Sequence, residues 1–338
     1  MIFAEKMACL CILKDRCGDN IMSLKEKILA QLGIFKKTTD GLQYYRQDNE
    51  VYIVGYKGSK KQVFHEIPAY IEDCPVVSLK NLQEMPLVGE IRIPDTIREI
   101  GGMCFEFQKK VTKFVIPNSV ESIGEHAFEF CDILEEIVFP DHLKLLPIGI
   151  CSENPKLKKI HLPESLEEIP DCFAGDCSSL EEIIIPESVK IIRELAFNDC
   201  KNLKNIYLPE NLEEISDYFL SGCDSLEEMI IPEHVKIIGK SAFGFCKNLK
   251  TVKLPEILEE IPDDFMNGCD SLEEIIIPEH VKMIGKSAFC LCKNLTSVKL
   301  PENLELIKKH AFADCPKLKT ENINIPVNCE VKTKAFDN

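Results

Sequence analysis

The stretch IIIPESVKIIRELAFNDCKNLKNIYLP, from Ile183 to Pro209, decides the fold because related copies of it recur along the chain. Proline returns at one constant spacing, at Pro94, Pro117, Pro140, Pro163, Pro186, Pro209, Pro232, Pro255, Pro278 and Pro301, and once more, two positions late, at Pro326. When each proline is numbered zero, apolar residues recur at +3, +6, +11, +17, +20 and +22. A unit this short cannot bury its own apolar face, so successive units should stack into a solenoid.

Each unit is expected to contain two extended segments on opposite sides of one coil. The segment from +17 to +22 alternates at its end and stops at the proline, which cannot donate to a strand ladder. A shorter segment spans +3 to +6, and an Ala-Phe pair then fills the interior beneath a short helical turn. Equivalent strands of successive coils should pair in parallel and in register. The predicted fold is a curved, right-handed repeat solenoid, mostly β with short helical turns and one long parallel sheet.

The repeat resembles the BspA-type leucine-rich repeat. The matching pattern is Ile-x-Leu-Pro-x-x-Leu-x-x-Ile-x-x-x-Ala-Phe-x-x-Cys-x-x-Leu, and it covers roughly Ile91 to Phe336. The segment from His65 to Leu79 is similar to a degenerate first repeat. The resemblance implies the leucine-rich-repeat fold and a binding role, in adhesion or host interaction at a cell surface, and it implies no chemistry.

Two regions are expected. Residues 91–338 form the leucine-rich-repeat solenoid, with ten full units and a partial last unit. Residues 1–90 form a small α+β cap, with a helix at about 23–32, a β-hairpin at about 43–56 and the degenerate first repeat at about 65–90. A cap is expected here because the first coil of a solenoid otherwise exposes apolar surface.

Composition and missing motifs argue against several classes of function. The 338 residues include 40 basic and 56 acidic side chains, for a net charge of −16. A surface this acidic repels phosphate, which argues against nucleic-acid binding. No apolar run is long enough to cross a bilayer, so membrane insertion is not expected. No sequence signature of a hydrolase, a zinc protease or a phosphate-binding loop occurs, and we predict no enzyme activity, no catalytic residue, no cofactor and no metal.

Cysteine occupies +14 in eight of the ten units: Cys131, Cys177, Cys200, Cys223, Cys246, Cys269, Cys292 and Cys315. In-register coils hold these side chains about 4.8 Å apart, farther than the Cβ separation of a disulfide, and zinc-ligand spacing is absent. We therefore predict that they pack the core as free thiols. Free cysteines and the lack of an evident signal peptide favour a reducing compartment, whereas the family resemblance favours the cell surface.

Charge alternates between successive units, so its period is two units. Position +4 reads Glu121, Lys144, Glu167, Lys190, Glu213, Lys236, Glu259, Lys282 and Glu305, and +18 alternates in the same way from Glu135 to Glu273. Like charges on adjacent strands repel, so the alternation predicts ladders of ion pairs along the stack. A charge-reading ligand site is the alternative interpretation.

Position +21 lies between two buried residues and should face solvent. Its apolar and aromatic residues predict a partner-binding face made of Val138, His161, Ile184, Tyr207, Ile230 and Lys253. The competing explanation is that branched residues stand there for their strand propensity.

The sequence therefore predicts a non-enzymatic binding module that presents its sheet face to a protein or glycan. Two alternatives remain: a structural protein without a dedicated ligand, which associates with itself through its C-terminal coil, and an enzyme whose site lies in residues 1–90.

Overall fold

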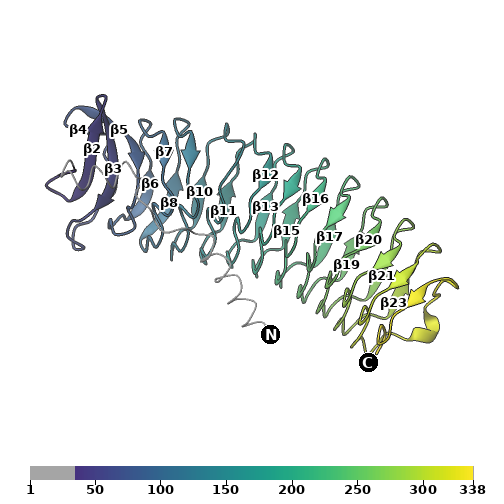
Figure 1. The fold of residues 1–338 in the computed structure, drawn as a ribbon. Helices are drawn as coiled ribbons and strands as arrows, with labels where there is room; N and C mark the ends of the chain where they lie inside the picture. The colour runs from purple at the N-terminus through teal and green to yellow at the C-terminus, as the bar shows by residue number, and fades with distance from the viewer. Residues whose placement is uncertain (1–34, 338) are drawn as a thin grey trace.

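The computed structural model describes residues 35–337, and these form an elongated, gently curved stack of coils (Figure 1). One row of strands is formed by the last residues before each repeat proline. It consists of β6 (Gly89–Arg92), β8 (Val111–Val115), β10 (Glu136–Val138), β11 (Lys159–His161), β13 (Glu182–Ile184), β15 (Asn205–Tyr207), β17 (Glu228–Ile230), β19 (Thr251–Lys253), β21 (Glu274–Ile276) and β23 (Ser297–Lys299). We call this row the main row. The predicted β-solenoid is confirmed.

A second row of two-residue strands lies on another side of the coils. It consists of β7 (Glu99–Ile100), β9 (Ser122–Ile123), β12 (Glu168–Ile169), β14 (Ile191–Ile192), β16 (Glu214–Ile215), β18 (Ile237–Ile238), β20 (Glu260–Ile261), β22 (Met283–Ile284), β24 (Leu306–Ile307) and β25 (Glu330–Val331). We call it the short row. These strands correspond to the shorter extended segment that the sequence indicates at +3 to +6.

Between the two rows lies a continuous apolar core. A phenylalanine at +10 or +11 of each unit from Phe173 to Phe336 contacts its equivalents one coil away, with ring centroids 5.1–6.1 Å apart. Phe197, Phe219 and Phe243 are fully buried within this column. Each coil therefore completes the core of its neighbours, as the length of the unit requires.

Strands of the main row pair in parallel and in register, with Ile184 opposite Tyr207, but they do not form one long sheet. The row divides into a four-stranded sheet (β11-β10-β8-β6) and three two-stranded sheets, β13-β15, β17-β19 and β21-β23. Around β15 the division coincides with the charges at +18. Lys204 binds Glu181 across β13-β15 at 2.9 Å, and among the described residues it forms no ion pair with Glu227 across the next gap. In this part of the main row the two-unit period of the sequence therefore corresponds to pairs of strands.

The helical turns that we expected after the short row are successive β-turns instead. In residues 35–337 the only helix is a 3₁₀ turn, η1 (Thr320–Asn322). The reason is that alternate N–H groups donate to the next coil: Leu195 to the carbonyl of Asp217 at 3.0 Å, and Phe197 to that of Phe219 at 3.1 Å. These donors cannot also serve the i→i−4 bonds of a helix.

The N-terminal region continues the short row. Strands β2 (Leu42–Gln47) and β3 (Glu50–Tyr56) form an antiparallel hairpin at the place that the sequence indicated, and β1 (Lys36–Lys37) pairs with β2. Strand β3 pairs in parallel with β5 (Cys74–Leu79), which pairs in turn with β7. The hairpin therefore extends the stack at its first coil. The helix expected at 23–32 lies outside the described residues, and a domain boundary at residue 90 stays a prediction.

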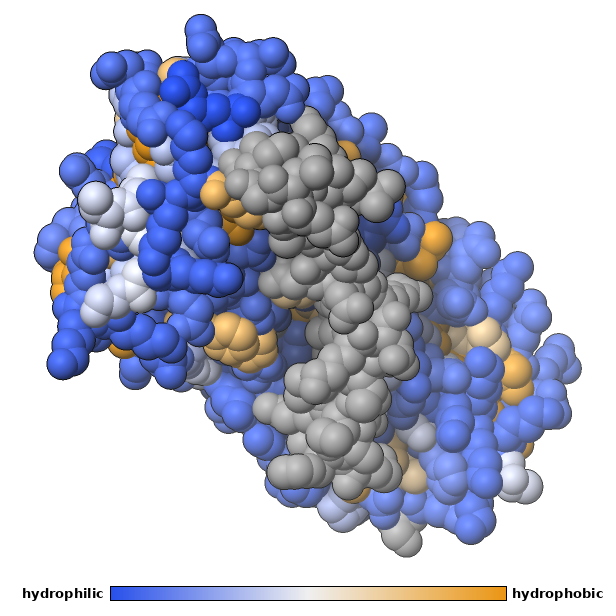
Figure 2. All heavy atoms as spheres, turned by 60° about the vertical axis from the view of Figure 1, so that its left-hand side comes forward, coloured by the Kyte–Doolittle hydropathy of each residue, from blue (hydrophilic) through white to orange (hydrophobic). Residues whose placement is uncertain are grey.

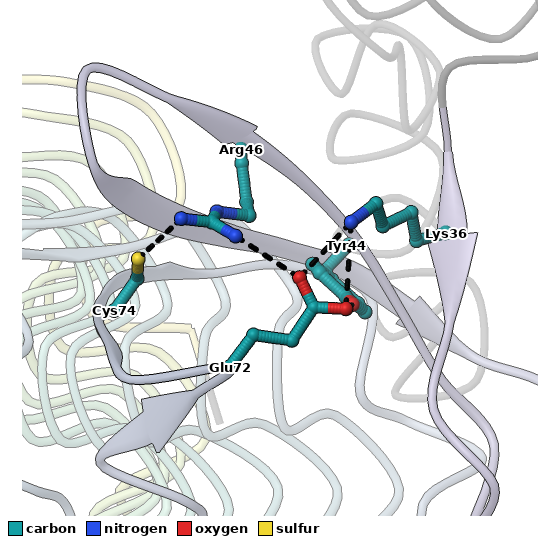
Figure 3. A network of polar contacts seen from close by, with 5 residues as sticks. All are labelled: Lys36, Tyr44, Arg46, Glu72 and Cys74. Atoms are coloured by element: carbon teal, nitrogen blue, oxygen red, sulfur yellow. Dashed lines mark hydrogen bonds and ion pairs between the residues drawn. The ribbon is translucent and has the colours of Figure 1, made fainter.

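The turn between β4 (Tyr70–Ile71) and β5 is fastened to the hairpin by one carboxylate, that of Glu72 (Figure 3). It accepts hydrogen bonds from Lys36 at 2.9 Å, from the hydroxyl of Tyr44 at 3.0 Å and from Arg46 at 3.0 Å. The bonds from Lys36, Tyr44 and Arg46 lower the pKa of Glu72. A second guanidinium nitrogen of Arg46 lies 2.6 Å from the Sγ of Cys74. The network joins strands β1, β2 and β5.

Candidate partner-binding face

The main row presents three large apolar side chains to solvent. Ile184, Tyr207 and Ile230 are 65%, 52% and 70% exposed, although the residues before them, Ile183, Ile206 and Met229, turn inward against the core. Ile184 and Tyr207 lie opposite each other in one two-stranded sheet, and Ile230 is in the first strand of the next. We call Ile184, Tyr207 and Ile230 the apolar patch.

The other three residues predicted for this face are engaged differently. Val138 is half-buried in the four-stranded sheet. His161 Nε2 lies 2.9 Å from Glu136, whose same oxygen also accepts a bond from Lys113 at 3.0 Å. Lys253 Nζ lies 2.9 Å from Glu233. Of the row predicted from the sequence, only the central part is both exposed and apolar, and Ile276, 59% exposed, follows beyond Lys253.

The rim at +18 consists of ion pairs, as the charge alternation predicted. Three pairs join neighbouring coils at this position: Lys158–Glu135 at 3.1 Å, Lys204–Glu181 at 2.9 Å and Lys250–Glu227 at 2.6 Å. At +4, Lys144–Glu167 and Lys236–Glu213 form the corresponding contacts at 2.9 and 3.7 Å. The charges of these ladders are balanced, so they supply no net field over the patch.

A second set of charges, which we did not predict, is not balanced. Position +1 is acidic in eight successive units: Asp141, Glu164, Glu187, Glu210, Glu233, Glu256, Glu279 and Glu302, all of them exposed. The backbone N–H of Glu256 donates to the Glu233 carboxylate at 3.0 Å, so neighbouring members are adjacent. We call this set the acidic column. The repeated Pro-Glu dipeptide was the sequence signal for it.

The acidic column borders the main row. The contact between Lys253 and Glu233 joins a +21 side chain to the +1 carboxylate of the same unit, and bonds from Lys253 and from the Glu256 N–H lower the pKa of Glu233. Within residues 35–337, Glu164, Glu187 and Glu210 form no ion pair. Figure 2 shows a largely hydrophilic surface with small separate apolar areas on the face in view.

The predicted thiol packing is confirmed. All eight cysteines at +14 are buried thiols outside any disulfide in the described chain, and burial raises the pKa of Cys177 and Cys246 to about 12. Each thiol donates to a carbonyl of the preceding coil: Cys223 to Phe197 at 3.2 Å and Cys246 to Leu220 at 3.1 Å are two examples. The two units without cysteine keep this bond, because Gln108 donates to Leu82 at 2.8 Å and Asn154 to Phe128 at 2.9 Å.

One buried polar cluster lies in and beside the irregular unit that begins at Pro140. The hydroxyl of Ser152 donates to Glu129 at 2.6 Å, and the other Glu129 oxygen lies 3.1 Å from Nδ1 of His126. Burial opposes protonation of His126, but Glu129 outweighs it and raises the pKa. The Glu129 carboxylate thus lies between the Ser152 hydroxyl and the His126 imidazole.

Two further features bear on chemistry. A cleft of about 750 Å³ lies between residues 65–69 and residues 90–94, away from the apolar patch, and Arg92 at its edge is paired with Glu90 at 2.6 Å. The described part of the chain contains no group of three His, Cys, Asp or Glu side chains suited to a metal ion. Nor does any helix between residues 35 and 337 have the length and apolarity needed to span a bilayer.

Comparison with known proteins agrees with the repeat geometry. A leucine-rich repeat protein from Bacteroides ovatus is 28% identical, with a TM-score of 0.61 over 87% of this chain and 89% of that one. The pneumococcal vaccine antigen PcpA (20% identity, TM-score 0.56, 88% and 92% covered) and a leucine-rich cell surface protein from Faecalibacterium prausnitzii (22%, 0.51, 86% and 94%) share the fold. No functionally curated protein matches.

A solenoid of this kind is typically a non-enzymatic scaffold. The family model of the BspA-type leucine-rich repeat region matches residues 83–175, 170–266 and 215–338, in six copies, and the chain therefore belongs to the BspA-type leucine-rich repeat family.

Proposed function

We propose that this protein is a non-enzymatic binding module that engages a protein partner through the apolar patch of the main row. The observation that carries the proposal is the exposure of Ile184, Tyr207 and Ile230 on adjoining strands whose other faces are fully occupied by the core. Contiguous exposed apolar surface marks interaction sites. Tyrosine at its centre offers a large rigid contact with a polar tip, the type of side chain that dominates interface energetics.

A protein fits this surface better than a glycan. The patch consists of projecting side chains, with branched aliphatic groups on both sides of the tyrosine ring, whereas the cleft near residue 90 lies elsewhere. The ion-pair ladder at +18 gives the patch a charged border, which is the usual anatomy of a protein interface. Adhesion or host interaction is the biological setting that we propose for this contact.

The test compares capture of partners from the native source by three forms of the full chain, followed by mass spectrometry. Changing Ile184→Asp together with Tyr207→Asp should leave folding intact, because both side chains point away from the core. Binding of the captured partner should fall at least tenfold, which corresponds to about 1.4 kcal/mol.

The matched control places the same two charges on the short row, as Ile237→Asp in β18 with Val331→Asp in β25, at side chains that are 57% and 41% exposed. This control should bind as the wild type does. Equal binding by all three forms would show that the main row is not the site.

A further inference from the structure

The apolar patch lies beside carboxylates that form no ion pair within residues 35–337. Lys253 defines the geometry, because it occupies the same +21 position one coil after Ile230, and its Nζ lies 2.9 Å from the carboxylate found 20 residues earlier, Glu233. The same offset along the chain places Glu164 beside Ile184, Glu187 beside Tyr207 and Glu210 beside Ile230. A lysine at the position of any residue of the patch would therefore reach a +1 carboxylate, as Lys253 reaches Glu233.

These three glutamates are uncompensated in the part of the chain that the structure describes. None of them forms an ion pair, whereas Glu181 and Glu227 at +18 are each held by a lysine of the next coil. On the opposite border, the outward side chains of Glu182 and Glu228 at +19 also form no ion pair. In the described part of the chain, five carboxylates without an ion pair therefore lie along the two borders of the three apolar side chains.

Such an arrangement is unfavourable in the free protein. Adjacent coils bring the members of the acidic column about one strand spacing apart, and like charges at that separation repel. Where Lys253 supplies a cation, its hydrogen bond lowers the pKa of Glu233. A cation delivered from outside would relieve the same repulsion at Glu164, Glu187 and Glu210.

We propose that the partner contributes a basic, amphipathic protein segment, in which apolar side chains contact Ile184, Tyr207 and Ile230 while flanking lysine or arginine side chains bind the bordering carboxylates as Lys253 binds Glu233. This inference rests on the proposed function and adds the chemistry of the partner. Apolar contact supplies most of the affinity, and complementary charge selects the partner and speeds its association.

The first experiment uses defined peptides with the full-length protein and follows binding by fluorescence anisotropy. A twelve-residue labelled peptide that alternates leucine and lysine should bind, with an affinity that falls as salt is added. A leucine–glutamate peptide should not bind, and a serine–lysine peptide should bind at least tenfold more weakly. Comparable binding of the leucine–glutamate peptide would overturn the inference.

The second experiment locates the charges. The triple change Glu164→Gln, Glu187→Gln and Glu210→Gln should weaken binding of the leucine–lysine peptide about tenfold. The control triple, Glu167→Gln, Glu213→Gln and Glu259→Gln, removes the same charge from position +4 and should leave binding within about twofold of the wild type. An equal loss in both triples would mean that the peptide responds only to net charge, and the inference would fail.

The two proposals fail in different ways. If the native partner is lost on Ile184→Asp with Tyr207→Asp but binds the acidic-column triple at full strength, the patch is the site and its partner is not basic. If the patch variant itself binds the native partner normally, the proposed function fails with it.

Discussion

At the scale of single residues, position +14 shows why one side chain recurs. A thiol, an amide of Gln108 or an amide of Asn154 fills the same role, which is to donate to a carbonyl of the preceding coil. Those carbonyls lie inside the core, where an unmet acceptor costs about 1–3 kcal/mol. Cysteine combines a weak donor with a small apolar volume. The repeat thus selects for a buried donor, and cysteine is its commonest form.

Thiol reactivity should separate the eight cysteines at +14 from the two half-buried cysteines of the described chain. The eight at +14 should resist a thiol reagent in the native protein, because they are buried and burial raises the pKa of thiols such as Cys177 and Cys246. Cys290 and Cys329 are only half-buried and should react first. Mass spectrometry of labelled peptides, with urea-denatured protein as the control, measures both groups. Rapid native labelling at +14 would contradict the packing.

The buried cluster around Glu129 predicts a dependence of stability on pH. Burial and the neighbouring Glu129 raise the pKa of Glu106 to about 7, above its ordinary value of 4.5. The folded protein then binds more protons than the unfolded chain between these values, so this group lowers the stability as pH rises from about 5 to about 8.

Replacing Glu106→Gln should remove that loss. The melting temperature of the variant should exceed that of the wild type at pH 8 and should approach it at pH 5, as thermal unfolding followed by circular dichroism would measure. A difference between the two proteins that does not change with pH would refute the assignment.

At the scale of elements, the strands of the main row from β13 onward hydrogen-bond in pairs, whereas the short row continues across the gap after β15, where β14 pairs with β16. Strands hydrogen-bond where a +18 glutamate meets the lysine of the next coil, as in β13-β15 and β17-β19, and the ladder is interrupted between these pairs. The same pairing holds at +15, where Lys247 binds Asp224 at 3.0 Å and Lys293 binds Asp270 at 2.9 Å. The coils that carry β17 and β19 are thus joined by an ion pair at each of the two positions.

A double-mutant cycle should detect the pairing. Glu181→Gln and Lys204→Met should show a coupling that shifts the melting temperature by about 1 °C in low salt and disappears at high salt. The same cycle between Lys204→Met and Glu227→Gln should show none, since no ion pair crosses that gap in the described chain. Equal coupling in the two cycles would mean that the ladder is continuous in solution.

Much of the arrangement of the strands could be predicted from the sequence, because the repeat period shows which positions are equivalent in successive coils. The parallel register, the inward +20 position, the buried thiols and the ion pairs all follow from the constant spacing of the units. The division into strand pairs could not, since it depends on which of two equally spaced neighbours Lys204 binds. The contacts of His161 and Lys253 were missed because each joins two different positions of the repeat, +21 to +19 for His161 and +21 to +1 for Lys253, whereas the spacing of the units reports only contacts between equivalent positions.

At the scale of the whole molecule, the unit that begins at Pro140 forms the least stabilising contacts with its neighbouring coils. It lacks a short-row strand, so that row ends at β9 and resumes at β12. Cys151 stands where other units carry a phenylalanine, and the aromatic column is absent between Phe128 and Phe173. In a solenoid, stability is the sum of units and their interfaces, so one poor interface allows the two sides to unfold separately.

We expect two transitions in urea. Phe243→Ala removes a fully buried ring, at a cost of about 3–5 kcal/mol, and should shift only the transition that belongs to the coils after residue 163. Phe105→Ala is the matched change on the other side and should shift only the other transition. Hydrogen exchange read by mass spectrometry assigns each one. A single transition that both variants move equally would show that the stack is cooperative across the irregular unit.

The bond from +14 to a carbonyl of the preceding coil also bears on how the chain is made. Every coil finds its acceptor in the coil completed just before it, as Cys223 finds Phe197. At about 5–20 residues per second, a ribosome completes one unit of the repeat in about 1–5 s. Local pairing is fast compared with that interval. The protein can therefore fold during its synthesis, one coil at a time, with each folded coil supplying the hydrogen-bond acceptors for the next.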